Sequence, residues 1–141
     1  MLKTSSDILA LDVGGTRIGV AHANPVARIA SPLTTVINDA TVFEKLVQLL
    51  QQQDAAVLVV GLPRNLSGDS TEQTRIVEQF VLQLKQHIDL PVYWQDEAVT
   101  SRQAEAELRA RGKPYAKGDI DALAATYILE DFLRDHPEVK A

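Results

Sequence analysis

The chain has 141 residues, of which 45% are hydrophobic and 23% charged, and its net charge is −5. This length and composition predict a single globular domain over residues 1–141. The absence of cysteine excludes disulfides and thiolate metal sites, and His22, His87 and His136 are far apart in the sequence and form no ligand motif, so a metal site would have to use carboxylates. The acidic balance argues against a general nucleic-acid binder, since such proteins neutralise phosphates with surplus Lys and Arg. No apolar run reaches the length of a membrane span and no signal peptide is evident, which predicts a cytoplasmic protein.

The first clear pattern is LALDVGGTRIGVA, residues 9–21. An apolar run over 8–13, a Gly-Gly-Thr turn and a second run over 17–23 predict a β-hairpin. Because side chains alternate along a strand, Asp12 shares a face with Ile8 and Ala10 in an otherwise apolar strand. A carboxylate there is costly unless hydrogen bonds, a cation or a metal ion compensate it. The alternative is that Asp12 only accepts N–H groups of the turn at 14–16.

The rest of the chain alternates helices and strands. An extended segment over 27–36 contains Pro32, which fits an edge strand. A helix over 40–53 follows the caps Asn38 and Asp39, and the continuous apolar run over 55–60 is typical of a buried parallel strand. We then expect a helix over 70–87, a strand over 90–95, a short helix over 100–112 and a last helix over 120–134. Ser70 with Gln73 forms a capping box at the start of the helix over 70–87, and Thr100 with Gln103 forms one at the start of the short helix. This order predicts an α/β fold, a mixed five-stranded sheet made of a three-strand antiparallel meander plus two parallel strands, flanked by helices.

Three acidic positions are expected on one rim of this sheet. Ligands gather outside the carboxyl ends of parallel strands, which would bring together Asp12, Glu97 beside Asp96, and Asp121 at the start of the last helix. Clustered carboxylates repel one another, so the arrangement makes sense mainly with divalent cations, for which Mg²⁺ is the natural candidate. Each acid also has a structural alternative: Asp119 caps the last helix, Asp121 complements its dipole, and Glu97 is solvated in a loop.

Four stretches together carry a family resemblance. LALDVGGTRIGVA, VVGLPRNLSGDS, the DE of QDEAVTS and KGDIDALAATYIL resemble the successive signatures of the YqgF family, the pre-16S rRNA nucleases also called Holliday-junction-resolvase-like proteins. The resemblance implies a ribonuclease-H-like fold and a nuclease dependent on Mg²⁺ or Mn²⁺, with Asp12, Glu97 and Asp121 as catalytic acids and metal ligands. The sequence departs from the family at Ala98, where an Arg is usual, and so lacks a bidentate phosphate ligand there.

The expected reaction is hydrolysis of a phosphodiester, with one or two metal ions activating water and stabilising the leaving oxygen. Arg17, Arg64, Asn65 and Lys117 are the candidates for binding phosphates. The stretch over 102–117 holds five basic residues against two acids, which fits either a nucleic-acid track or a solvated helix face.

RNA, in the form of pre-16S rRNA, is the expected partner. A four-way DNA junction would demand a broad positive surface on a symmetric dimer, which an acidic chain with a small basic strip does not offer. The alternatives are a Holliday-junction-type DNA resolvase, a catalytically weak RNA-binding scaffold, and an ATP-binding sugar-kinase or actin-like module. The last would use the Asp-x-Gly-Gly-Thr turn as a phosphate loop, but the chain has no room for a second lobe.

Overall fold

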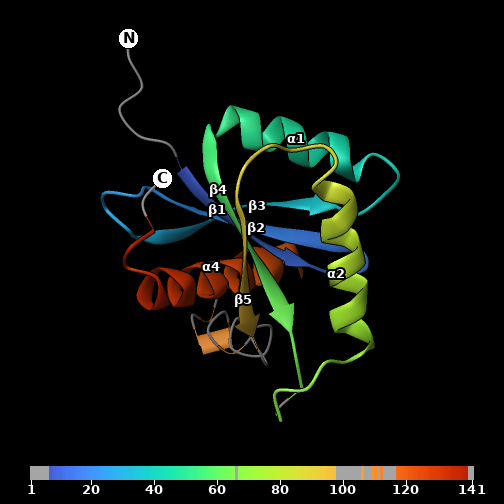
Figure 1. Ribbon diagram of the computed structural model, residues 1–141. Helices are drawn as coiled ribbons and strands as arrows, with labels where there is room; N and C mark the ends of the chain where they lie inside the picture. The colour runs from blue at the N-terminus through green and yellow to red at the C-terminus, as the bar shows by residue number, and fades with distance from the viewer. Residues whose placement is uncertain are drawn as a thin grey trace.

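A five-stranded sheet forms the centre of the molecule, in the order β3-β2-β1-β4-β5 (Figure 1). The computed structural model describes residues 7–65, 67–97, 106, 109–110, 112 and 117–139, with only the backbone of 117 and 118. Strands β1 and β2 pair antiparallel, as do β2 and β3, whereas β4 is parallel to both β1 and β5. The predicted mixed sheet is confirmed. The strands are β1 (Asp7–Val13), β2 (Arg17–Ala23), β3 (Ala30–Ile37), β4 (Ala55–Pro63) and β5 (Val92–Glu97).

Helices cover both faces of the sheet (Figure 1). On one face, α1 (Val42–Gln52) and α2 (Glu72–Leu84) pack on a core that contains Leu9 and Leu11 of β1. On the other, α4 (Lys117–Asp135) packs on a core that contains Ile8 and Ala10. The predicted alternation of β1 is therefore confirmed, because neighbouring residues of one strand serve two separate cores. None of the helices in the described ranges is long and apolar enough to cross a membrane.

The edge position predicted for the third strand is confirmed, but the strand begins three residues later than expected. Asn24 Oδ1 accepts hydrogen bonds from the backbone N–H groups of Val26 and Ala27, which makes a turn of that segment. Arg28 then has a φ of 54°, so the extended backbone starts only at Ala30. The register shifts opposite Pro32, where a missing N–H interrupts the ladder on an open edge.

The predicted capping box of α2 lies one residue further on. The Oγ1 of Thr71 accepts from the N–H of Thr74, and Thr74 Oγ1 accepts from the N–H of Thr71. Ser70 is not the cap, because its hydroxyl accepts a hydrogen bond from Arg64 instead. At α1, Asp39 accepts from the Thr41 N–H and pairs with Lys45, while Thr41 is the N-cap without a side-chain cap bond.

Three elements extend beyond their predicted ends. Strand β4 continues to Pro63 and β5 to Glu97, because these two residues still pair as parallel neighbours. Asp96 and Glu97 therefore belong to a strand and not to the loop that was the structural alternative. Helix α4 begins at Lys117, which places Asp119 in its first turn. The predicted capping role of Asp119 is wrong, because a cap precedes the first helical residue. The capping box at 100 and 103, and Ala98, lie outside the described residues.

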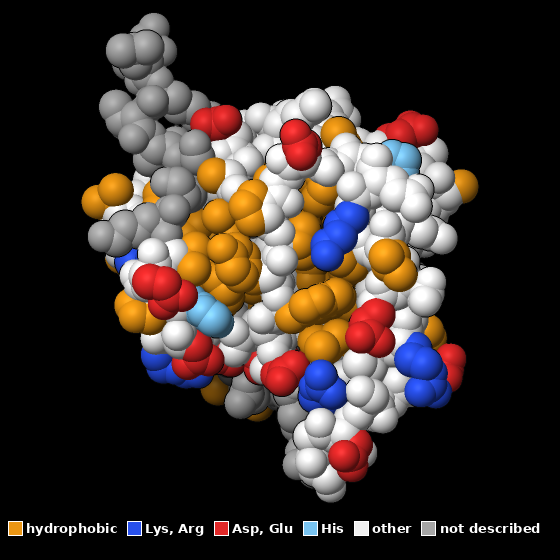
Figure 2. All heavy atoms as spheres, viewed as in Figure 1, with side chains coloured by type: hydrophobic (Ala, Val, Ile, Leu, Met, Phe, Trp, Pro, Cys, Tyr) orange, Lys and Arg blue, Asp and Glu red, His pale blue; other side chains and the backbone are white. Residues whose placement is uncertain are grey.

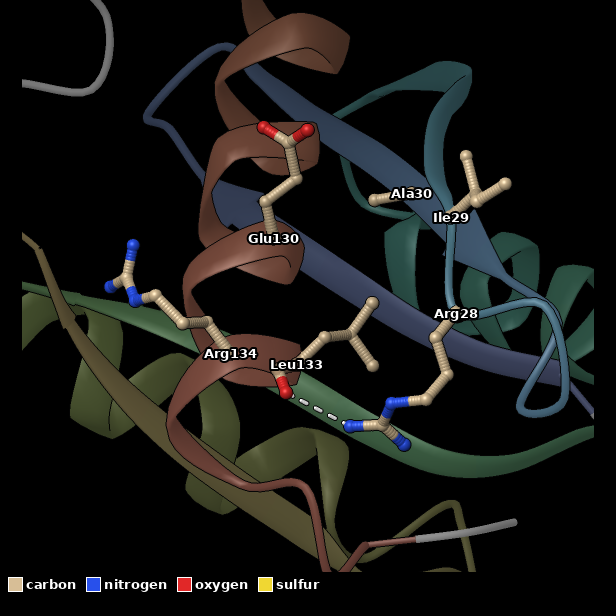
Figure 3. Close-up of a pocket in the computed structure, with 6 residues that line it drawn as sticks. All are labelled: Arg28, Ile29, Ala30, Glu130, Leu133 and Arg134. Atoms are coloured by element: carbon tan, nitrogen blue, oxygen red, sulfur yellow. Dashed lines mark hydrogen bonds between the residues drawn. The ribbon is translucent and has the colours of Figure 1, made fainter.

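The carboxyl end of α4 is held by Arg28 from the β2–β3 connection. Its guanidinium donates to the backbone oxygens of Leu133 at 2.9 Å, His136 at 3.1 Å and Val139 at 2.7 Å. A cation here satisfies carbonyls that a helix end leaves free and complements the negative end of the helix dipole. An open cavity of about 400 Å³ lies beside this contact, and Figure 3 shows residues that line it, among them Ile29 and Leu133. Because Ala30 on its rim aligns with the amino end of β1, the cavity lies far from Asp12.

We expect Arg28→Met to destabilise the protein by about 2 kcal/mol, because three charge-assisted hydrogen bonds are lost at a helix end. Chemical denaturation with circular dichroism measures the change. The matched control is Arg75→Met, which removes only an exposed ion pair with Glu72 and should cost less than about 0.5 kcal/mol. Equal effects of the two substitutions would contradict the holding role of Arg28.

Candidate active site

Asp12 lies near the carboxyl end of β1, on the face that α4 covers. Its cross-strand partner is Gly19 of β2, so both positions face the same way. Burial and, after it, the nearby charge of Asp121 together raise the pKa of the Asp12 carboxyl from 3.8 to about 6. The structure thus places Asp12 in the environment that its pattern predicts, an ionisable group enclosed with a second carboxylate.

Gly19 explains why the first turns of α4 reach this position. A Cβ built on Gly19 would overlap the backbone oxygen and carbon of Asp121 and come within 2.8 Å of the backbone nitrogen of Ala122. Only the absence of a side chain lets the helix backbone rest directly on β2. This approach brings Asp121 beside Asp12. A lone glycine inside the strand RIGVAHA is the sequence signal for such an approach, and our sequence analysis did not use it.

Glu97 lies on the same side of the sheet but meets a different part of α4. Its carboxyl is hydrogen-bonded to Asp131, which is ten residues, or about 15 Å of helix, beyond Asp121. The pKa of Glu97 is raised to about 9, first by burial, then by this hydrogen bond and by the charge of Asp131. Glu97 Oε1 is buried without a hydrogen-bond partner among the described residues. A carboxyl in this environment holds its proton more strongly than an exposed glutamate does.

The structure brings together two of the three expected acids. Asp12 and Asp121 are neighbours, whereas the described contacts of Glu97 are with Asp131 and the adjoining charges of Arg134 and Asp135. Within the described ranges, no group of three His, Cys, Asp or Glu residues is placed to hold a metal ion. Sequence reasoning missed the acids near the end of α4, because they lie on a helix whose pattern was examined for its apolar face.

The candidate phosphate ligands mostly have partners within the protein. Arg17 Nε donates to Asp121 Oδ2 at 2.6 Å, and Arg64 Nε donates to Asp96 Oδ1 at 3.1 Å. Asn65 Oδ1 accepts from the backbone N–H groups of residues 67 and 69, and so shapes the loop after β4. The side chain of Lys117 lies outside the described residues, as does most of the basic stretch over 102–117.

The pH dependence of stability tests the environment of Glu97. A carboxyl whose folded pKa is raised from 4.5 to about 9 opposes folding once it ionises, so its contribution to stability falls as pH rises between these values. Asp12 adds to the fall in stability only between its unfolded pKa of 3.8 and its folded pKa of about 6. We therefore expect the melting temperature of the metal-free protein to fall from pH 6 to pH 9, and Glu97→Gln to flatten this fall.

The matched control is Glu78→Gln, which changes an exposed glutamate on α2 and should leave the slope as in the wild type. An unchanged slope in Glu97→Gln would show that Glu97 ionises normally.

Comparison with known proteins shows to which family the chain is similar. The family model "RuvX: Holliday junction resolvase" matches residues 6–135. A protein of Sulfurihydrogenibium sp. (strain YO3AOP1), named "Putative pre-16S rRNA nuclease", is 42% identical over 130 residues, covering 91% of this chain and 90% of the relative. A protein of the same name from Roseiflexus sp. (strain RS-1) is 40% identical over 130 residues, covering 89% of this chain and 92% of the relative.

Solved structures support the fold. Thermus thermophilus RuvC in complex with a Holliday junction substrate is 18% identical with a TM-score of 0.55, and the match covers 95% of this chain and 98% of RuvC. The Fowlpox virus resolvase in complex with Holliday junction DNA is 12% identical with a TM-score of 0.51, covering 95% of this chain and 99% of the resolvase. The ribonuclease-H-like fold expected from the resemblance is thereby confirmed. The chain belongs to the RuvX family, also called YqgF, and its class of activity is that of a nuclease, a hydrolase of phosphodiester bonds.

Proposed function

We propose that this nuclease matures the 5′ end of pre-16S rRNA, with Mg²⁺ or Mn²⁺ held by Asp12, Asp121 and Glu97. The observation that carries the proposal is the enclosed pair of carboxyls, Asp12 and Asp121, at the carboxyl end of β1. The charge of Asp121 raises the pKa of Asp12, so the two carboxylates are unfavourable neighbours, and a divalent cation between them would remove that cost.

The donor set suits a hard cation. Carboxylate oxygens are the ligands that Mg²⁺ prefers, and the chain has no cysteine that would favour a softer metal. Asp12 and Asp121 are the first ligands. Glu97 is the proposed third, since its buried Oε1 has no described partner, and it would have to leave Asp131 to join them. When bound, the metal would lower the pKa of a water molecule and stabilise charge on the phosphate.

The protein's own residues would orient the substrate. Arg64 and Asn65 lie on the loop that follows β4, at the same end of the sheet as Asp12, and Lys117 begins α4. The Arg64 guanidinium is paired with Asp96, whose side chain is 67% exposed. Such a pair exchanges readily for a phosphate, because exposed ion pairs contribute little to stability. Arg17 joins this group as a fourth candidate phosphate ligand.

Single-stranded RNA fits the surface charge better than a four-way junction. On the face in Figure 2, the Lys and Arg side chains of the described residues are scattered among Asp and Glu. A chain of net charge −5 can therefore neutralise few phosphates. We expect a shallow salt dependence of binding, corresponding to about two to four phosphates.

The test is cleavage of a labelled, 5′-extended 16S rRNA fragment beside a synthetic four-way DNA junction, with Mg²⁺ or Mn²⁺ and across a salt series. Metal-dependent cleavage of the RNA with the junction left intact is the expected result. Symmetric resolution of the junction with intact RNA would assign the chain to DNA. Cleavage of neither would favour an RNA-binding scaffold without catalysis.

A further inference from the structure

Arg17 and Asp121 form a short ion pair within the candidate site. It joins the first residue of β2 to the start of α4 through a single bond of 2.6 Å from Nε to Oδ2. The Arg17 side chain is 30% exposed and that of Asp121 20%, so water screens the pair only in part. A charge-assisted bond of this length in a partly enclosed site is stronger than an exposed pair.

Asp121 therefore faces charges of both signs. Asp12 is close enough for the charge of Asp121 to raise its pKa, and Arg17 is in direct contact with Asp121. A positive group in contact with the second of two neighbouring acids does for them what a bound cation would do. It balances part of their charge and holds one carboxylate in place on α4.

We propose that Arg17 is a built-in counter-ion that holds Asp121 in the metal-free protein and gives up this carboxylate when a divalent cation binds. The inference rests on the proposed metal site at Asp12 and Asp121. A guanidinium in contact with a ligand oxygen both occupies a lone pair of that oxygen and repels an incoming cation. Metal binding therefore has to break this contact, and the affinity measured for the wild type includes the cost of breaking it.

Removing the guanidinium should tighten metal binding. We expect Arg17→Gln to bind Mn²⁺ about tenfold more tightly than the wild type in calorimetry, since about 1.4 kcal/mol of competition is lost. Arg17→Lys keeps the positive charge and should stay within about threefold of the wild type. Arg75→Gln is the matched control, because it removes the same charge from an exposed ion pair with Glu72, and its affinity should not change.

A second measurement is made on the wild type and needs the variant Arg17→Lys only to assign one signal. In the wild type, the Nε–H of Arg17 should exchange slowly with water in the absence of metal, because it donates to Asp121. Saturating Mg²⁺ should remove this protection, observed by NMR of the arginine Nε–H groups with Arg17→Lys identifying the signal. Protection that persists at saturating Mg²⁺ would overturn the proposal, since Arg17 would then orient the metal-bound carboxylate.

The outcomes separate the inference from the proposed metal site. Weaker or equal Mn²⁺ binding by Arg17→Gln, with Asp121→Asn abolishing it, would overturn the role of Arg17 and leave the site standing. Binding that is the same in the wild type, Asp121→Asn and Arg17→Gln would place the metal elsewhere. That result would contradict both the site and the inference.

Discussion

Asp12→Asn is expected to reduce metal-dependent cleavage by at least about 1,000-fold, because the amide cannot supply the charge that a divalent cation needs at this position. In the metal-free protein the same change should be stabilising. Burial and the charge of Asp121 raise the pKa of Asp12 from 3.8 to about 6, so its ionised form opposes folding above that pH. We expect a gain of about 3 kcal/mol at neutral pH and none at low pH, where the carboxyl is already neutral.

Two measurements check this pair of effects: cleavage rates with saturating Mn²⁺, and denaturation in a chelating buffer at neutral and acidic pH. The matched control is Asp89→Asn, which changes an exposed carboxylate near the amino end of β5 and should alter neither quantity. A loss of metal-free stability in Asp12→Asn, with cleavage retained, would instead make Asp12 a structural acceptor for the turn that follows it.

Gly19→Ala should strongly destabilise the protein, although it adds only one methyl group to the sheet. The new methyl group would overlap the backbone of Asp121, and backbone cannot move aside as a flexible side chain can. The first turns of α4 would have to lift from β2, which exposes part of the core and draws Asp121 away from Asp12. We expect a destabilisation of about 3 kcal/mol or more, together with loss of Mn²⁺ binding.

Gly15→Ala is the control for this prediction. Gly15 belongs to the same hairpin, its φ lies outside the positive region, and a Cβ there would meet nothing within 4 Å. Its effect on unfolding free energy should stay within about 0.5 kcal/mol. If Gly19→Ala were equally mild, α4 would not depend on close contact with β2, and the position of Asp121 would need another explanation.

Local patterns were reliable wherever one element decides the outcome. The alternation of β1 assigned Leu9 and Leu11 to one core and Ile8 and Ala10 to the other, and the continuous run after residue 55 indicated a central parallel strand. Errors arose where two residues compete for one role. Ser70 and Thr71 both suit an N-cap, and Thr71 takes the role, while the Ser70 hydroxyl accepts a hydrogen bond from Arg64 in the loop that follows β4.

The sequence by itself determined the strand order, the face on which Asp12 lies, and the four motifs that indicated the family, because periodicity and turn chemistry act over a few residues. Only the tertiary structure decided which acids meet. Asp121 reaches Asp12 through the packing of α4 on Gly19, while Glu97 is turned toward Asp131 by the crossing of β5 and the later half of that helix. The distance between side chains on different elements depends on how closely their backbones approach, and no local period encodes that approach.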